Sequence, residues 1–240
     1  MTPWSALQIV NQLAGELGLA STTSVVGTDP QSRQLLAALN SAGNELMLYY
    51  PWAQFSTEWS FNTQVSVGTY VMPSDWRYFI DQTQWDRTNH WPLLGPKSPQ
   101  EWAWLKGGLV ASFPRTRYRV VGNNFQIWPV PASPFTPYTF AMEYISKNWV
   151  ASPGLGAVDM VSSDGDVCQY DPWLLIKYVK LKFYGLKGFD TKDAQAEFTR
   201  VFESLTGKDV GAPVLSLVPV LSPMFIGPQS VPDGNWNTGP

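Results

Sequence analysis

The chain has 240 residues, which is long enough to bury a core as one elaborated domain or as two small ones. Charged residues make up 15% of it and the net charge is -3, which excludes a basic field that would attract nucleic acid. The single cysteine, Cys168, excludes an internal disulfide, and no apolar run approaches membrane-spanning length. The N-terminus does not resemble a signal peptide, so we expect synthesis in the cytosol.

Helical signals open the chain. A polar residue followed by proline at positions 2–3 is a good helix start, and apolar residues then recur at spacings of three and four until Gly18. A second polar-proline pair at positions 29–30 begins an apolar stripe that runs to Pro51. The first fifty residues are therefore predicted to form two helices.

The middle of the chain has a different pattern. From residue 52 to about residue 150, short β-prone runs separated by Gly, Pro and Asn replace the helical period. Residues 122–124 mark the clearest hairpin turn. One helical island interrupts the region, where Ser98 and Glu101 have the spacing of a capping box. This part is predicted to be a β-rich insert.

Helical periodicity returns at residues 171–172, stops at Gly188, and continues in a last helix to Gly207. Four amphipathic helices, two at each end of the domain, bury their stripes most simply against one another. The predicted fold class is therefore α+β, with a helical bundle built from N- and C-terminal helix pairs. The expected parts are the bundle (residues 1–51 and 166–208), an inserted β-rich domain (52–150) and an extended Pro-rich C-terminal arm (209–240).

The C-terminal arm has an unusual composition. It contains six prolines, and Asp233 is its only charged side chain after Asp209. It lacks a periodic face for a core of its own, yet it is too apolar for a solvated tail. As polyproline II it would reach on the order of 90 Å, so we expect it to grip a neighbouring subunit or a partner. The residues expected at that interface are Val214, Leu217, Leu221, Met224, Phe225, Ile226 and Trp236.

Candidate catalytic residues are sparse. The only histidine, His90, lies in a polar stretch typical of a turn, which favours a structural or exposed role over that of a base. Cys168 lies just before a predicted helix, whose N-terminus can lower a thiol pKa, but an inert thiol is preferred. The sequence thus predicts no catalytic residue.

Two patterns bear on metals and phosphates. Asp159, Asp164 and Asp166 resemble an oxygen-rich cation loop but lack the spacing and closing Glu of an EF-hand, so turn-forming aspartates are preferred. The paired glycines at 107–108 are not followed by Lys-Ser or Lys-Thr, and no G-x-G-x-x-G occurs. No metal site and no cofactor are predicted.

Tryptophan beside carboxylates is also a pattern of sugar binding or glycoside hydrolysis. In the insert, Asp75, Asp81, Asp86 and Glu101 lie near five tryptophans in sequence. Hydrolysis requires two carboxylates at a defined separation, which sequence cannot establish, and tryptophan in a β-rich region more often serves packing. A carbohydrate-recognising module, with or without hydrolytic activity, remains the alternative function.

Several short motifs occur in a set order over roughly residues 5–206. They are LGL at 17–19 with DPQSRQLL at 29–36, WDRTN at 85–89 with PLLGP at 92–96, SPQEW at 98–102 and EYIS at 143–146. With these motifs and its order of helices and β insert, the chain resembles the head-to-tail adaptor proteins of tailed bacteriophages. The similarity extends to the tail tubular protein A type and, more closely, to chains described simply as phage adaptor proteins.

The resemblance implies a ring, usually of twelve copies, beneath the portal vertex of the virion, continuing the DNA channel toward the tail. The bundle would form the ring wall, and the arm would reach the portal protein or an adjacent subunit. Double-stranded DNA would pass without sequence-specific binding, which suits a mildly acidic protein. No membrane is implied. The insert would meet the downstream tail or nozzle protein through Trp91, Trp102 and Trp104. Under the alternative function, the insert is a carbohydrate-recognising tail module.

Overall fold

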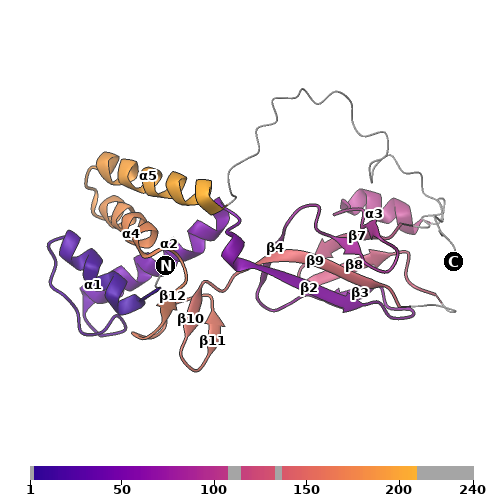
Figure 1. Ribbon diagram of the computed structural model, residues 1–240, viewed down its shortest axis with the longest axis horizontal. Coiled ribbons are helices and arrows are strands. Elements are labelled where there is room, and N and C mark those ends of the chain that lie inside the picture. The colour runs from indigo at the N-terminus through magenta and orange to yellow at the C-terminus, as the bar shows by residue number, and fades with distance from the viewer. Residues whose placement is uncertain (1–2, 108–114, 133–136, 210–240) are drawn as a thin grey trace. The chain divides into compact units, whose positions relative to one another are not determined.

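The protein is seen here as a computed structural model, which describes residues 3–107, 115–132 and 137–209 (Figure 1). These residues form two compact units. The terminal unit contains residues 3–56 and 145–209, and the middle unit contains the described residues between 57 and 144.

The terminal unit combines helices with a small antiparallel sheet, whose strands pair in the order β1-β12-β10-β11. Its helices are α1 (Ala6–Glu16), α2 (Pro30–Tyr49), α4 (Pro172–Lys187) and α5 (Lys192–Asp209), with a short 3-10 turn η1 (Ala53–Phe55). Its strands are β1 (Trp4–Ser5), β10 (Val150–Ser152), β11 (Gly156–Val158) and β12 (Val167–Cys168).

The ends of α2 and α4 follow from local chemistry, as predicted. Asp29 caps α2 by accepting the N–H of Ser32 at 2.9 Å, and Asp171 caps α4 by accepting the N–H of Trp173 at 2.9 Å. Proline follows each aspartate at the first helical position, where its missing N–H is not needed. Helix α4 stops at Gly188, which has φ +74°, a conformation that glycine adopts without strain.

The start of α1 differs from the prediction. The sequence favoured a helix from Pro3, but Trp4 and Ser5 form strand β1 and pair with β12. Ser5 then caps α1 in a capping box with Gln8, whose side chain accepts the N–H of Ser5 at 3.0 Å. A two-residue strand leaves no periodic signal in the sequence. The polar-proline pair at positions 2–3 therefore predicted a helix that begins too early.

Helix α4 packs against α1, α2 and α5. Leu174, Leu175, Ile176 and Val179 are all fully buried, so α4 hides apolar side chains on more than one face. Such a helix draws its stability from packing on several sides rather than from one amphipathic stripe. It is the central helix of the terminal unit.

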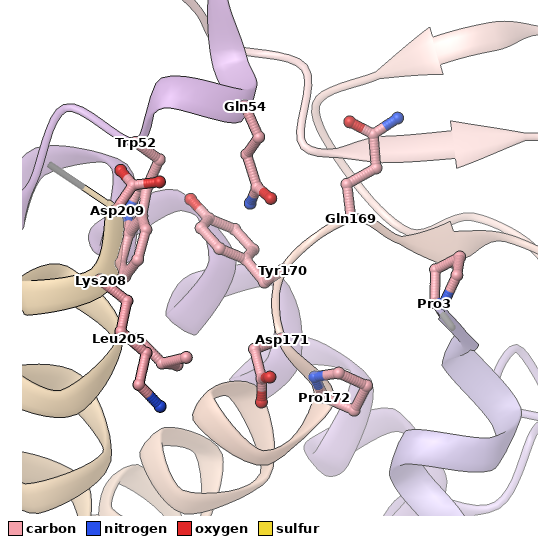
Figure 2. Close-up of a pocket in the computed structure, with 10 residues that line it drawn as sticks. All are labelled: Pro3, Trp52, Gln54, Gln169, Tyr170, Asp171, Pro172, Leu205, Lys208 and Asp209. Atoms are coloured by element: carbon pink, nitrogen blue, oxygen red, sulfur yellow. The ribbon is translucent and has the colours of Figure 1, made fainter. Parts of the chain in front are cut away.

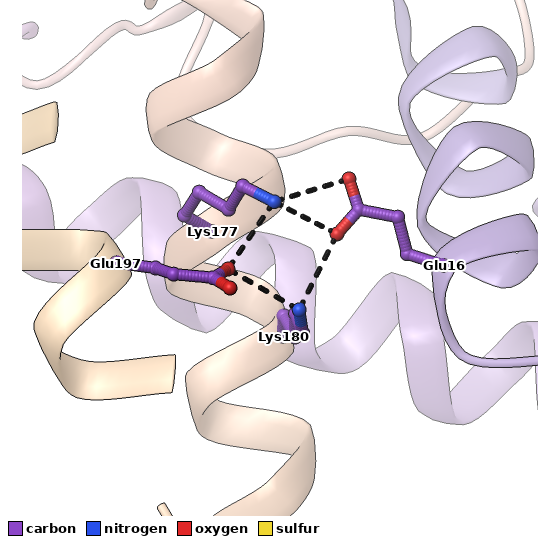
Figure 3. A network of polar contacts seen from close by, with 4 residues as sticks. All are labelled: Glu16, Lys177, Lys180 and Glu197. Atoms are coloured by element: carbon purple, nitrogen blue, oxygen red, sulfur yellow. Dashed lines mark hydrogen bonds and ion pairs between the residues drawn. The ribbon is translucent and has the colours of Figure 1, made fainter. Parts of the chain in front are cut away.

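A network of four charges also joins three of these helices (Figure 3). Lys177 of α4 lies 3.0 Å from Glu16 of α1 and 3.3 Å from Glu197 of α5. Lys180, one turn further along α4, lies 3.6 Å and 3.2 Å from the same two carboxylates. Each charge has two opposite neighbours, and the side chains are mostly shielded from solvent, so salt screens them less than isolated surface pairs.

The middle unit is built mainly of β-strands. One sheet has the order β2-β9-β5-β6, with β4 also paired to β9, and the other has the order β3-β8-β7. The strands are β2 (Ser56–Asn62), β3 (Thr69–Val71), β4 (Trp76–Phe79), β5 (Trp85–Asp86), β6 (Trp91–Pro92), β7 (Arg117–Val121), β8 (Asn124–Trp128) and β9 (Thr139–Ser146), and the helix is α3 (Pro99–Lys106).

Aromatic side chains fill the core of the middle unit. Tyr118 of β7 stacks on Phe125 of β8, with ring centroids 5.0 Å apart. These two strands form the hairpin that the sequence predicted, closed at Gly122, which has φ +58°. The fully enclosed members of this core are Met72, Leu93, Tyr118, Phe125, Ile127, Phe140 and Met142.

The predicted fold class is wrong. The described residues form three sheets and five helices, and sheets dominate the middle of the chain. One sheet lies in the terminal unit among the helices, so the terminal helix pairs do not form a helical bundle. The missed strands β10, β11 and β12 have only two or three residues, too few for an alternating pattern to appear in the sequence.

Candidate assembly surfaces

A groove of about 530 Å³ opens on the terminal unit (Figure 2). Trp52 and Tyr170 line it, with ring centroids 5.9 Å apart, and the Gln54 side chain extends toward Tyr170. Its wall includes the last turn of α5. We call it the Trp52 groove, and its lining residues are Pro3, Trp52, Gln54, Gln169, Tyr170, Asp171, Pro172, Leu205, Lys208 and Asp209.

The carboxylates of the Trp52 groove are engaged within the protein. Asp209 accepts the N–H of Ala53 at 3.0 Å, and Asp171 accepts the N–H of Trp173 at the start of α4. Trp52 and Tyr170 are themselves buried, so the accessible side chains of the groove are mainly those of Pro3, Gln54, Gln169, Leu205 and Lys208. Sequence reasoning missed it, because its walls come from four separate stretches of chain.

The terminal unit also exposes large apolar side chains. Leu155 is 73% exposed in the turn between β10 and β11, where Gly154 and Gly156 have positive φ. Leu48 at the end of α2 and Phe189 after α4 are exposed as well. Single exposed apolar side chains are common on protein surfaces, and it is a contiguous apolar patch that marks an interface. The Pro-Gly-Leu-Gly run at residues 153–156 is the sequence signal of this turn.

The three tryptophans predicted to meet a tail component have different surroundings. Trp104 of α3 is 55% exposed, Trp91 of β6 is partly buried, and Trp102 is only 4% exposed. The guanidinium of Arg119 lies 5.5 Å from the Trp102 ring, and the ammonium of Lys106 lies 5.8 Å from it. Trp102 thus anchors α3 to its own unit, and Trp104 is the one presented to solvent.

The predicted arm contacts lie outside the described residues. They are Val214, Leu217, Leu221, Met224, Phe225, Ile226 and Trp236.

Asp166 is fully buried and organises the loop before β12. Its carboxylate accepts the hydroxyls of Ser152 at 2.6 Å and Ser163 at 2.7 Å, and the N–H groups of Ser162 at 2.6 Å and Ser163 at 2.8 Å. Burial alone would raise the pKa of Asp166, but these hydrogen bonds outweigh it and lower the pKa to about 2. Asp166 is therefore a structural anion.

The other two aspartates of the predicted turn also hold the fold. Asp164 accepts the N–H of Val25 at 2.6 Å, which fastens the loop between α1 and α2. The carbonyl of Asp159 accepts the indole N–H of Trp149 at 2.8 Å. Over the described ranges, no group of three or more His, Cys, Asp or Glu side chains is placed to hold a metal ion.

Cys168 and His90 occupy sites without catalytic geometry. Cys168 is buried in β12, where burial and then the charge of Asp166 raise the pKa of its thiol to about 12. His90 is exposed in the turn between β5 and β6, with φ +58°. The thiol is therefore protonated at neutral pH and enclosed by protein.

Three of the four carboxylates weighed for hydrolysis have structural partners. Asp75 accepts the hydroxyl of Tyr144 at 3.0 Å. Asp86 is buried and accepts two backbone N–H groups of the turn that follows it. Glu101 closes the capping box of α3 by accepting the N–H of Ser98 at 3.0 Å. None of these contacts indicates an acid paired with a nucleophile or base.

In the described part of the chain, the Trp52 groove and the exposed apolar side chains are surfaces available to a binding partner. No helix in the described part of the chain has the length and apolar character needed to cross a membrane. The family model of the SU10 adaptor protein matches residues 5–214, and no curated protein sequence matches the chain. The protein belongs to the SU10 adaptor protein family, and is thus a phage head-to-tail adaptor.

The family points to a structural protein rather than an enzyme. Adaptors of this kind are components of the bacteriophage virion and contact other head and tail proteins. The resemblance seen in the sequence is thereby confirmed at the level of the family.

Proposed function

We propose that the protein forms a ring of twelve copies between the portal vertex and the tail, and that this ring continues the DNA channel. The family match is the observation that carries this proposal. The net charge of -3 agrees with it, because a mildly acidic wall lets DNA phosphates slide rather than bind. DNA passes through without sequence-specific contacts.

In this proposal the terminal unit builds the ring wall. Its exposed Leu48, Leu155 and Phe189 are available to neighbouring subunits. A closed ring needs two different patches on each copy, because every interface joins one face of a subunit to the other face of the next. We assign the exposed apolar side chains at separate places on the unit to these two patches.

The remaining parts contact the head and the tail. The C-terminal arm, through Val214, Leu217, Leu221, Met224, Phe225, Ile226 and Trp236, binds the portal protein or a neighbouring subunit. Trp104, supported by the partly buried Trp91, meets the downstream tail or nozzle protein. Trp102 is buried and does not contact the tail component directly in this proposal. The carbohydrate alternative gains no support, since three of its candidate carboxylates have structural partners.

Mass measurement in solution tests the ring. The purified chain is measured alone and with purified portal protein, by native mass spectrometry and electron microscopy. We expect a ring-shaped assembly with twelve times the 26.8 kDa mass of the chain, either free or on the portal. A chain that stays monomeric and does not bind the portal protein at micromolar concentration contradicts the proposal.

A further inference from the structure

The Trp52 groove is a rigid feature of the terminal unit. The indole N–H of Trp52 donates to the carbonyl of Leu46 at 3.0 Å, and the hydroxyl of Tyr170 donates to the carbonyl of Gly43 at 3.1 Å. Both acceptors belong to α2, so the two aromatic side chains are fastened to one helix. The groove therefore exists before anything binds to it, and an occupant does not have to order its walls.

The groove suits an uncharged, extended peptide. Asp171 and Asp209 are held by backbone N–H groups, and among the described residues that line the groove Lys208 is the one cation. The amides of Gln54 and Gln169 can each donate and accept a hydrogen bond. An extended or polyproline II segment offers unpaired backbone groups to such amides, and its apolar side chains can contact the exposed Pro3 and the partly exposed Leu205.

The groove also lies where such a segment begins. Leu205, Lys208 and Asp209 line it from the last turn of α5, and the chain continues from Asp209 into residues 210–240. Residues 213–219 have the sequence PVLSLVP, with proline at both ends and no charge. Because this segment is tethered at the rim, its effective concentration near the groove is roughly millimolar.

We propose that the Trp52 groove binds residues 213–219 of the same chain. Val214 and Leu217 are also proposed to contact the portal protein or a neighbouring subunit in the virion. Docking in the groove is therefore proposed for the free subunit, and it does not depend on ring formation. The groove is thus a binding site for an uncharged Pro-rich peptide.

Site-specific photo-crosslinking tests the occupant in the full chain. A photoreactive amino acid replaces Gln169 at the groove, and in a control chain it replaces Gln195, which is exposed on α5 away from the groove lining. We expect crosslinks from position 169 to residues 213–219 and at least fivefold fewer from position 195. An equimolar mixture with isotope-labelled chain should yield crosslinks within one chain only.

A charge placed in the segment supplies a second readout. Leu217→Asp introduces a carboxylate into the docked segment, whereas Ser230→Asp adds the same charge outside it. We expect the first variant to reduce the crosslink yield at position 169 at least fivefold and the second to leave it unchanged. Crosslinks between different chains, no crosslinks to residues 213–219, or equal yields in both variants would each overturn the proposal. Ring formation is scored separately by mass, so failure of one proposal does not imply failure of the other.

Discussion

Gly43 of α2 lies against the indole ring of Trp149, so closely that a Cβ on Gly43 would overlap the ring atoms Cζ2, Cε2 and Cη2. Trp149 is fully buried, and its N–H donates to the carbonyl of Asp159 at 2.8 Å. The Gly43 carbonyl in turn accepts the Tyr170 hydroxyl. Helix and ring are therefore held on both sides, and neither can move aside for a methyl group.

Replacing Gly43 is expected to destabilise the terminal unit. Gly43→Ala should lower the free energy of unfolding by about 3 kcal/mol, because overpacking forces either the ring or the helix to shift. The control is Gly15→Ala on α1, where a Cβ meets nothing within 4 Å. That change should raise the free energy of unfolding by about 0.5 to 1 kcal/mol through helix propensity. Urea unfolding measures both, and equal effects would contradict the close packing.

Asp166 should make stability depend on acid pH. Because folding lowers its pKa to about 2, its contribution is complete above about pH 4 and is lost as pH falls toward 2. The shift corresponds to about 2 kcal/mol. Asp166→Asn should therefore be less stable than the parent by at least this amount at pH 7, with a difference that narrows below pH 4. Urea unfolding from pH 2 to 7 tests this, with Glu203→Gln on the exposed face of α5 as control. A difference that does not change with pH would refute the assignment.

Two leucines of α4 should respond differently to truncation. Leu175 is fully buried, so Leu175→Ala should cost about 2 to 5 kcal/mol of unfolding free energy. Leu181 is partly exposed, and Leu181→Ala should cost clearly less. Thermal and urea unfolding measure the pair. Equal losses would show that the buried side of α4 has been assigned incorrectly.

Replacing the two tryptophans of α3 should affect different properties: Trp104 binding to the tail component, and Trp102 the stability of the fold. Trp104→Ala should change the free energy of unfolding by less than about 0.5 kcal/mol, because the side chain is mostly exposed. It should weaken binding of the downstream tail component by about 2 kcal/mol, or roughly thirtyfold in Kd. Trp102→Ala should instead cost about 3 to 5 kcal/mol of stability.

Binding titration and urea unfolding of both variants decide this prediction. Oxidative footprinting of the free ring and of the intact virion adds an independent measurement. Trp104 should be labelled in the first state and protected in the second. Unchanged labelling would leave the downstream contact unassigned.

Local signals predicted much of the secondary structure. Asp29 and Asp171 mark helix starts because their carboxylates satisfy the first free N–H groups and proline follows them. Gly188 ends α4, and Gly122 closes the β7–β8 hairpin, because both positions need positive φ. Each signal involves neighbours in sequence, which is why it can be interpreted without the fold.

Most of the candidate site could not be predicted in this way. Trp102 and Trp104 are two residues apart with similar sequence surroundings, yet Trp102 is buried beside Arg119 and Trp104 is exposed. The Trp52 groove joins the N-terminus, the residues after α2, the residues before α4 and the end of α5, which are far apart along the chain. Only the packing of the helices brings these stretches together.

The chain's own residues were thus enough to set the starts of α2 and α4, the end of α4, the hairpin turn and the family resemblance, because capping groups, glycine conformations and motif order act over a few positions. The tertiary structure alone decided that β1, β10, β11 and β12 form a sheet within the terminal unit, and that Asp166 is fully buried. Strand pairing and burial depend on segments distant in sequence. Gly43 shows the difference, since nothing near it in the chain indicates that the Trp149 ring fills the space of its missing side chain.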